Sequence, residues 1–219
     1  LARLGGDLHA YLDTAFDGTK EMREIISTIL DKGRNEQRLD STSVNINDVL
    51  TTTLRFWEAD AAFKHGVEKI LNLDPDLPAV EAVYAHWSQS FDNLLSNAMA
   101  AMVDTDVKQL SIRTEFGDQN IRIEIQDTGH GMDETTLERI FDPFFTTRSD
   151  GLGTGLGLAS VKALLEPYGV TIGVASSPGR GTRFELTLPL VDNKPDAPVS
   201  PPQASRRRLR RAGDGAASG

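Results

Sequence analysis

A carboxylate and two glycines stand together where a strand is expected to end. The stretch 121–125 alternates isoleucine with polar residues, which is typical of a strand with one buried face, and Asp127 continues the parity of the isoleucines. An ionised carboxylate aimed inward is costly unless N–H donors meet it. Asp127 is therefore satisfied by the protein's own backbone or by a ligand that carries an N–H group. Gly129 and Gly131 follow at once and remove side chains where something must approach the backbone closely.

A second glycine series lies further along the chain and opens a predicted helix. It occupies every second position from Gly151 to Gly157. The first amide groups and the positive dipole end of a helix favour an anion. One segment thus offers a carboxylate to a polar ligand edge and the other offers a phosphate site. Together they indicate a nucleotide-binding site.

Two asparagines lie on the helix expected over residues 82–102. Asn93 and Asn97 are four residues apart, on the side roughly opposite an apolar stripe. Two amides on a helix are usually a solvated face. The small neighbours Ser90 and Ala100 or Ala101 nevertheless leave room for a ligand against this helix. The stripe itself consists of Trp87, Phe91, Leu94, Leu95, Ala98 and Met102.

The remaining elements follow from periodicity and turn residues. A helix is expected from about Asn47 to about Lys64, with Asn45 or Asn47 as its N-cap. Thr182 shares the inward parity of the last predicted strand, so its hydroxyl faces the same interior as Asp127 if the two strands are neighbours. The other expected elements are a strand over 67–73, a hairpin of 108–116 with 121–127, a short helix over 134–140, a lid over 141–153, a helix that ends at Glu166, and a hairpin of 170–175 with 182–188.

The two ends of the chain differ from its middle. Residues 8–29 carry a heptad seam, which calls for a partner helix and favours a helical bundle or dimer, although short seams more often fold back on their own domain. We expect this helix to end at Gly33, a linker over 34–43, a folded domain over 44–190 and a disordered Pro/Ala/Arg-rich tail over 191–219. The chain begins with Leu, so we expect a fragment of a longer protein.

Composition excludes several classes of protein. The tail has a net charge of +3, which leaves −12 on residues 1–190 and argues against a nucleic-acid binder. The absence of cysteine excludes a disulfide framework and a thiol nucleophile. The sequence contains neither a membrane-spanning run nor a signal peptide. We expect a cytoplasmic location, while membrane segments of a longer parent could lie upstream.

Five motifs in order resemble the catalytic ATP-binding domain of sensor histidine kinases, within the wider gyrase, Hsp90, kinase and MutL ATPase group. The resemblance covers residues 44–190, and residues 8–33 resemble, less specifically, the second helix of the dimerisation hairpin. The motifs, which match the N, G1, F, G2 and G3 boxes, are N-L-L-S-N-A at 93–98, D-T-G-H-G-M at 127–132, F-D-P-F-F-T-T at 141–147, G-T-G-L-G-L at 153–158 and G-R-G-T at 179–182.

The resemblance implies an α/β two-layer sandwich of the Bergerat type, in which a mixed sheet packs on helices and binds ATP and Mg²⁺. Asp127 would accept from the adenine amino group, supported by Thr182 through a water. Asn97 and Asn93 would bind Mg²⁺, and Arg148 would be a counter-charge for the phosphates. The other implied nucleotide contacts are Gly129, Gly131, Met132, Phe145, Gly153, Thr154, Gly155, Leu156 and Gly157.

The resemblance also implies a mechanism. Clamp-type ATPases of the wider group carry a water-activating glutamate where this chain has Asn93, and an amide cannot take a proton. Hydrolysis should therefore be slow, and ATP is kept for transfer to a histidine of its own or a partner's dimerisation domain. The family's acceptor motif is absent here; His9, His65, His86 and His130 do not match it. A response-regulator receiver domain and a homodimer of the full-length protein are the further implied partners.

Two other hypotheses stay open on the sequence. The chain could be a regulatory module, such as an anti-sigma factor or a kinase inhibitor, that binds ATP only to present a partner surface. The missing acceptor histidine favours this hypothesis, whereas the phenylalanine-rich F box and the heptad helix favour a kinase. A clamp ATPase is disfavoured by Asn93 and by the short chain.

Overall fold

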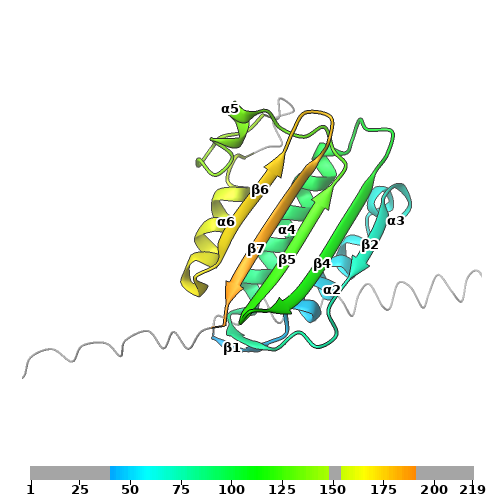
Figure 1. The fold of residues 1–219 in the computed structure, drawn as a ribbon. Coiled ribbons are helices and arrows are strands. Elements are labelled where there is room, and N and C mark those ends of the chain that lie inside the picture. Colours follow the sequence, from blue (N-terminus) through cyan, green and yellow to red (C-terminus); the bar gives the residue numbers. More distant parts are fainter. Residues whose placement is uncertain (1–39, 148–153, 191–219) are drawn as a thin grey trace, which may run out of the picture.

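In the computed structural model, residues 40–147 and 154–190 are described, and they form two layers (Figure 1). One layer is a five-stranded sheet in the order β2-β4-β5-β7-β6. Strand β2 runs parallel to β4 and the other pairs are antiparallel. The strands are β2 (Glu68–Asn72), β4 (Gln109–Gly117), β5 (Asn120–Asp127), β6 (Thr171–Ser176) and β7 (Thr182–Pro189).

Helices α2 (Ile46–Trp57), α4 (Tyr84–Ala101) and α6 (Gly157–Leu165) cover one face of this sheet (Figure 1). Helix α4 lies at the centre, and the side chains of Trp87 and Phe91 on its predicted stripe are fully buried. The inward residues of β5, such as Ile123, are fully buried as well. Apolar burial between the helices and the sheet is the main stabilising contribution to such a fold. The predicted mixed-sheet sandwich is confirmed.

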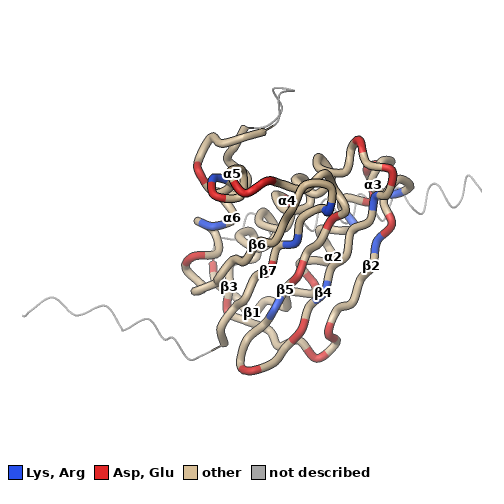
Figure 2. Tube along the Cα trace, turned by 45° about the horizontal axis from the view of Figure 1, so that its top comes forward, with Lys and Arg blue, Asp and Glu red and all other residues tan. Residues whose placement is uncertain are grey.

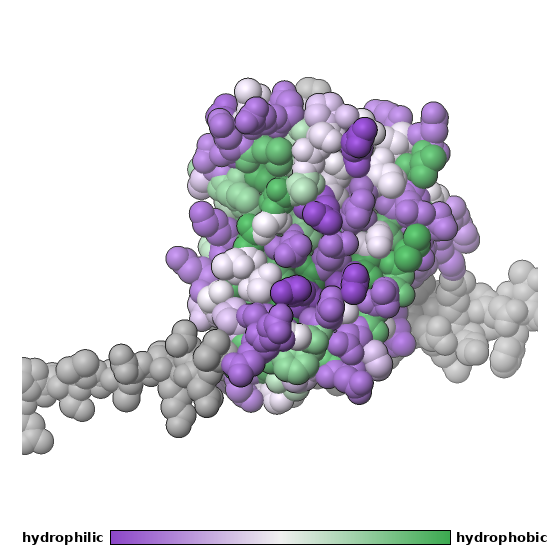
Figure 3. Space-filling model, viewed as in Figure 1, coloured by the Kyte–Doolittle hydropathy of each residue, from purple (hydrophilic) through white to green (hydrophobic). Residues whose placement is uncertain are grey.

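The opposite face of the sheet is polar. Arg113 of β4 lies opposite Glu124 of β5, and Glu115 lies opposite Arg122. Figure 2 shows acidic and basic residues along these strands, and Figure 3 shows a largely hydrophilic surface over them. Opposite charges in facing positions stabilise a sheet modestly. The one-sided alternation read from the sequence therefore has its physical cause in a single buried face.

Hairpin β4–β5 closes through a two-residue turn. Asp118 and Gln119 have φ angles of 52° and 58°. Two successive left-handed residues form the turn whose twist matches that of paired strands. In the resulting register Asp127 pairs with Leu110 on one side and with Thr182 of β7 on the other. The prediction that Asp127 and Thr182 face the same interior is confirmed.

Two helical predictions were wrong in extent. The helix expected over 47–64 is α2 followed by a separate α3 (Ala61–Gly66). Asp60 lies between them in an extended conformation, and its carboxylate accepts from the backbone N–H of Phe63 at 2.9 Å. This N-cap starts a new helix in a new direction. The helix expected over 134–140 is only α5 (Glu134–Leu137).

Two strands near the start of the domain were also missed in the sequence prediction. Strand β1 (Thr42–Val44) begins inside the predicted linker and pairs with β3 (Val80–Ala82) in a second, two-stranded sheet. Asn45 then caps α2, because its side chain accepts from Asn47 N at 2.8 Å. A short 3-10 helix, η1 (Glu166–Tyr168), follows α6 and begins at Glu166, where that helix was expected to end. The heptad helix, residues 34–39 of the linker and the tail over 191–219 lie outside the described residues.

Within the part of the chain that the structure describes, no helix is both long and apolar enough to cross a bilayer.

Candidate functional site

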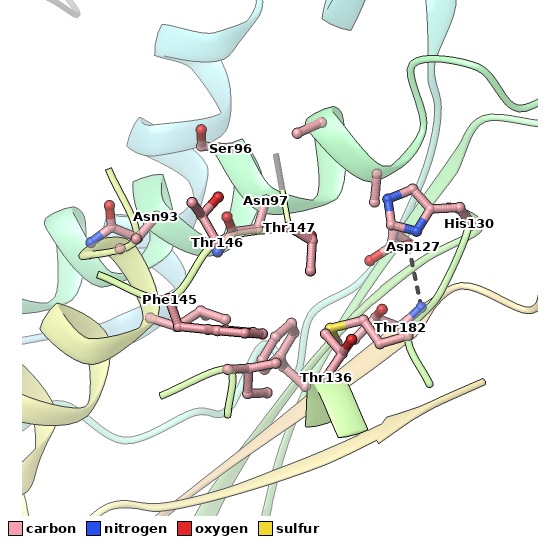
Figure 4. Close-up of a pocket in the computed structure, with 18 of the residues that line it drawn as sticks. Asn93, Ser96, Asn97, Asp127, His130, Thr136, Phe145, Thr146, Thr147 and Thr182 are labelled. Carbon is pink, nitrogen blue, oxygen red and sulfur yellow. Dashed lines mark hydrogen bonds between the residues drawn. The ribbon is translucent and has the colours of Figure 1, made fainter. Parts of the chain in front are cut away.

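A cavity of about 240 Å³ lies where α4, the ends of β5 and β7, the segment after α5 and the start of α6 come together (Figure 4). Most of the predicted site residues within the described ranges line it. These are Asn93, Asn97, Asp127, Met132, Phe145, Thr154, Gly155, Gly157 and Thr182. Leu156 is 40% exposed and does not line the cavity. Arg148 and Gly153 lie outside the described residues.

Asp127 is a buried carboxylate at the floor of this cavity, with 4% of its surface exposed. Its Oδ1 accepts from the backbone N–H of Gly129 at 2.8 Å and of Thr182 at 3.2 Å. Burial raises the pKa of the Asp127 carboxyl, while these two N–H groups and nearby His130 lower it less strongly. No hydrogen bond among the described residues uses its Oδ2, so this oxygen is available to a ligand donor.

Ser176 holds the residues beside Asp127, and no sequence pattern indicated it. Its Oγ donates to Gly181 O at 2.8 Å and accepts from Met132 N at 2.8 Å. Its contact with the Thr182 hydroxyl, at 3.0 Å, therefore uses the hydroxyl proton of Thr182. The lone pairs of the Thr182 hydroxyl are therefore unused, and this hydroxyl can accept a hydrogen bond from the cavity.

The two glycines after Asp127 meet the protein's own backbone. A Cβ on Gly129 would lie 2.5 Å from the Ala101 side chain of α4, and one on Gly131 would lie 2.0 Å from Ser177 O. Gly131 also has a φ of 68°, which favours glycine. Neither residue lines the cavity. The close approach predicted from these glycines is thus between chain segments, and it fixes the loop that carries Asp127.

The asparagine pair faces the cavity from α4, as its spacing predicted. Asn93 and Asn97 are half-buried, and the Asn93 Oδ1 lies 3.6 Å from where a Cβ on Gly157 would be. The N box thus meets the start of α6. Ser90 is on this side of α4 by its spacing but does not line the cavity, since it is fully buried and donates to His86 O at 2.7 Å. The small residues of α4 that line the cavity are Ser96, Ala100 and Ala101.

Helix α6 begins with its first turn open. Leu156 makes no side-chain cap hydrogen bond. The first amide groups of a helix have no partner within the helix and favour anions. Gly155, with a φ of 66°, brings the chain into this helix beside Phe144, where a Cβ would lie 2.3 Å from a backbone carbon. The predicted anion site is therefore at one end of the cavity that contains Asp127.

Part of the predicted lid forms another wall. Phe145, Thr146 and Thr147 line the cavity, and Arg139 lies over the Phe145 ring at 4.3 Å from its centroid. Phe144 takes a φ of 68° and donates its N–H to Gly155 O at 2.8 Å. A left-handed phenylalanine is strained. This hydrogen bond ties the predicted lid to the glycine segment before α6.

Several wall residues were not on the predicted list. One of them is His130, which lies within the G1 motif and does not match the acceptor motif. Among the described residues of the wall, Asp127 and His130 are the two that carry a carboxyl or an imidazole group. Four others lie within the quoted motifs without having been assigned a contact, namely Ser96, Thr146, Thr147 and Leu158. Thr136, Ile140 and Phe184 lie outside those motifs and join the wall only through the fold.

A comparison with known protein families shows the family of this chain. Residues 83–192 match the family described as histidine kinase-, DNA gyrase B-, and HSP90-like ATPase. The chain belongs to this ATPase family. The match runs from the start of α4 through β7. It contains every described residue that lines the cavity.

Individual relatives agree with this assignment. The chain is 33% identical over 175 residues to sensor histidine kinase ZraS of Klebsiella oxytoca, covering 80% of this chain and 37% of the relative. It is 33% identical over 155 residues to sensor protein TdiS of Thauera aromatica, covering 69% and 28%. Among solved structures, the catalytic domain of histidine kinase ThkA matches with a TM-score of 0.60 and 26% identity, covering 69% of this chain and 96% of that one.

These relatives identify the chain as the sensor-histidine-kinase type of ATPase domain. The regulatory-module hypothesis is not favoured, because the relatives are named as sensor kinases. The chain spans well under half the length of the curated relatives that it matches.

Proposed function

We propose that this chain provides the catalytic ATP-binding part of a two-component sensor histidine kinase and transfers the γ-phosphoryl group of ATP to a histidine outside the domain. One observation carries the proposal. A single cavity joins a buried carboxylate with an unused oxygen, a pair of helix amides and an open helix N-terminus. This combination suits the base, the metal-bound phosphates and the phosphate oxygens of one nucleotide.

The base would bind at the Asp127 end. Asp127 Oδ2 accepts an N–H of the adenine amino group, and the Thr182 hydroxyl accepts through a bridging water. Met132 and Phe184 line the same end and offer apolar contact to the ring. The network around Ser176 holds Met132 and Thr182 in place, so little ordering is left to occur on binding.

The amide pair of α4 fits a magnesium ion carried by the nucleotide. Mg²⁺ prefers oxygen ligands and keeps several waters while it bridges phosphates. No cluster of three or more His, Cys, Asp or Glu that could hold a metal occurs in residues 40–147 and 154–190. Asn97 and Asn93 would therefore hold the ion through amide oxygens together with phosphate oxygens. When bound, Mg²⁺ neutralises negative charge on the phosphates.

The phosphates would lie at the start of α6. Backbone N–H groups there donate to phosphate oxygens, and the helix dipole adds positive potential. The described wall contains no lysine or arginine. Arg148, outside the described residues, is proposed as the counter-charge from the predicted lid.

Transfer then depends on position more than on acid–base chemistry. A histidine nitrogen attacks the γ-phosphorus in line, the bond to the β–γ bridging oxygen breaks, and ADP leaves with that electron pair. Asn93 cannot accept a proton from water, which keeps hydrolysis slow. The acceptor lies on the dimerisation domain of the same or a partner subunit in a homodimer, and a response-regulator receiver domain takes the phosphoryl group afterwards.

The test is transfer in trans. The chain is mixed with a separate dimerisation-domain fragment of the parent that carries the acceptor helices, and γ-labelled ATP is added. We expect an acid-labile, alkali-stable label on the acceptor fragment and none on the chain alone. Asn97→Ala should abolish labelling, whereas Gln89→Ala, on an exposed position of the same helix, should not. Release of labelled inorganic phosphate at the same rate with and without acceptor would contradict a kinase.

A further inference from the structure

The imidazole of His130 lies beside Asp127 and is directed toward the cavity (Figure 4). Two backbone hydrogen bonds fix the residue that carries it. His130 N donates to Ala101 O of α4 at 3.0 Å, and His130 O accepts from Gly179 N at 2.7 Å. The main chain of His130 is therefore held by two segments that are far from it in sequence.

The ring has a defined hydrogen-bonding state. Its Nδ1 lies 2.6 Å from the carbonyl oxygen of Gly131. A carbonyl only accepts, so Nδ1 carries the proton in this contact. In the neutral ring Nε2 is then a lone-pair acceptor, and in the protonated ring it becomes a donor. His130 thus offers a second acceptor next to the carboxylate of Asp127 when it is neutral.

The described part of the cavity wall around His130 does not offer another polar side chain to pair with its Nε2 acceptor. Helix α4 contributes Ala100 and Ala101 to the wall at this point, and their side chains carry no polar group. Asp127 on β5 is close enough for His130 to affect its titration, and Arg180 follows Gly179, whose N–H binds the His130 carbonyl. The cavity wall on this side is otherwise uncharged.

We propose that His130 is a specificity-determining residue that acts with Asp127 to select a purine with a 6-amino group over a 6-oxo purine. This inference rests on the proposed ATP-binding function. An exocyclic amino group brings two N–H donors to two acceptors. A 6-oxo group brings an acceptor instead, which would leave lone pairs facing one another without a proton. Protonation of the imidazole converts one of the two acceptors to a donor and relaxes the selection.

The experiment compares ADP with IDP, which differ only at the base, by calorimetric titration of the whole chain. We expect wild type to prefer ADP and His130→Ala to lose roughly tenfold of that preference when both proteins are titrated at about pH 8.

A second variant makes the outcome specific. His130→Lys presents a donor alone, so its ADP preference should fall below that of His130→Ala, and matched urea midpoints will show that both variants fold. If wild type binds neither nucleotide, the proposed function itself fails. If all three proteins bind ADP and show the same ratio of ADP affinity to IDP affinity, only the role of His130 is overturned.

Discussion

The turn between β6 and β7 offers a matched pair of glycines that tests how the site loop is held. Gly179 and Gly181 are two residues apart and both have a φ of 76°. They differ in the space around a Cβ. Nothing lies within 4 Å of a Cβ on Gly179, whereas one on Gly181 would lie 2.0 Å from the carbonyl oxygen of Asp127. Alanine at either position suffers the same backbone strain, and alanine at Gly181 adds a clash with the site.

The difference in unfolding free energy can be worked out from this geometry. A left-handed alanine costs about 1–2 kcal/mol relative to glycine, and its smaller unfolded-state entropy offsets part of this cost at both positions. A carbon and a carbonyl oxygen need about 3.3 Å, so alanine at Gly181 requires a displacement of over 1 Å. Overpacking of this kind costs about 1–3 kcal/mol. We expect Gly181→Ala to lose about 2 kcal/mol more stability than Gly179→Ala.

The displacement should also reach the ligand. The Gly181 carbonyl accepts from Ser176, and the next residue, Thr182, donates to Asp127. Gly181→Ala should therefore weaken binding of an ATP analogue, and Gly179→Ala should leave it close to wild type. Urea unfolding and calorimetric titration of the two variants measure both effects. Equal stability and equal affinity in the two variants would refute the conclusion that this turn packs against the Asp127 backbone.

Two further predictions concern single side chains. Burial raises the pKa of Asp127 above its ordinary 3.8, so the stability it contributes is complete below the unfolded-state pKa and is lost as pH rises through the folded-state pKa. Asp127→Asn should remove this loss of stability. Urea unfolding of both proteins across acidic pH measures the effect, and parallel curves of unfolding free energy against pH would contradict the prediction. Tyr168 Oη accepts from Val83 N at 3.0 Å and lies 2.8 Å from His86 Nδ1. Tyr168→Phe should therefore lower the free energy of unfolding by about 1 kcal/mol. An unchanged urea midpoint would show that this link between α4 and η1 contributes nothing to stability.

The parts of the fold that the sequence predicted are those with a local period. Alternation along β5 and β7 is enough to place Asp127 and Thr182 on one side of the sheet, because a strand turns each successive side chain to the opposite face. Asp127 pairs with Thr182 because β5 and β7 are neighbours in the sheet. The asparagine pair of α4 followed in the same way from helical spacing.

The parts that were missed depend on contacts between distant segments. Strands β1 and β3 are three residues each and gain their stability by pairing with one another, so neither has a pattern of its own. The break before α3 depends on one capping carboxylate, Asp60, within an otherwise helical stretch. Ser176 has no signal at all, because its three partners come from two other loops and β7.

The glycines show a different limit of prediction from sequence. A missing Cβ indicates that something comes close, but the sequence does not tell whether it is a ligand or the chain. Gly129 makes room for Ala101 and Gly131 for Ser177, each of them far away in sequence. Only the packed structure separates these two cases.

The measurement that tests the central claim most directly is calorimetric titration of the whole chain and of Asp127→Asn with a non-hydrolysable ATP analogue, with and without Mg²⁺. An asparagine can keep both backbone hydrogen bonds of Asp127 through its amide oxygen, while its NH₂ replaces the acceptor that faces the cavity. We predict magnesium-dependent binding by wild type and a loss of about ten- to a hundredfold in the variant, which remains folded. Equal affinity of the two proteins, or no binding by wild type, would contradict the assignment of this cavity to ATP.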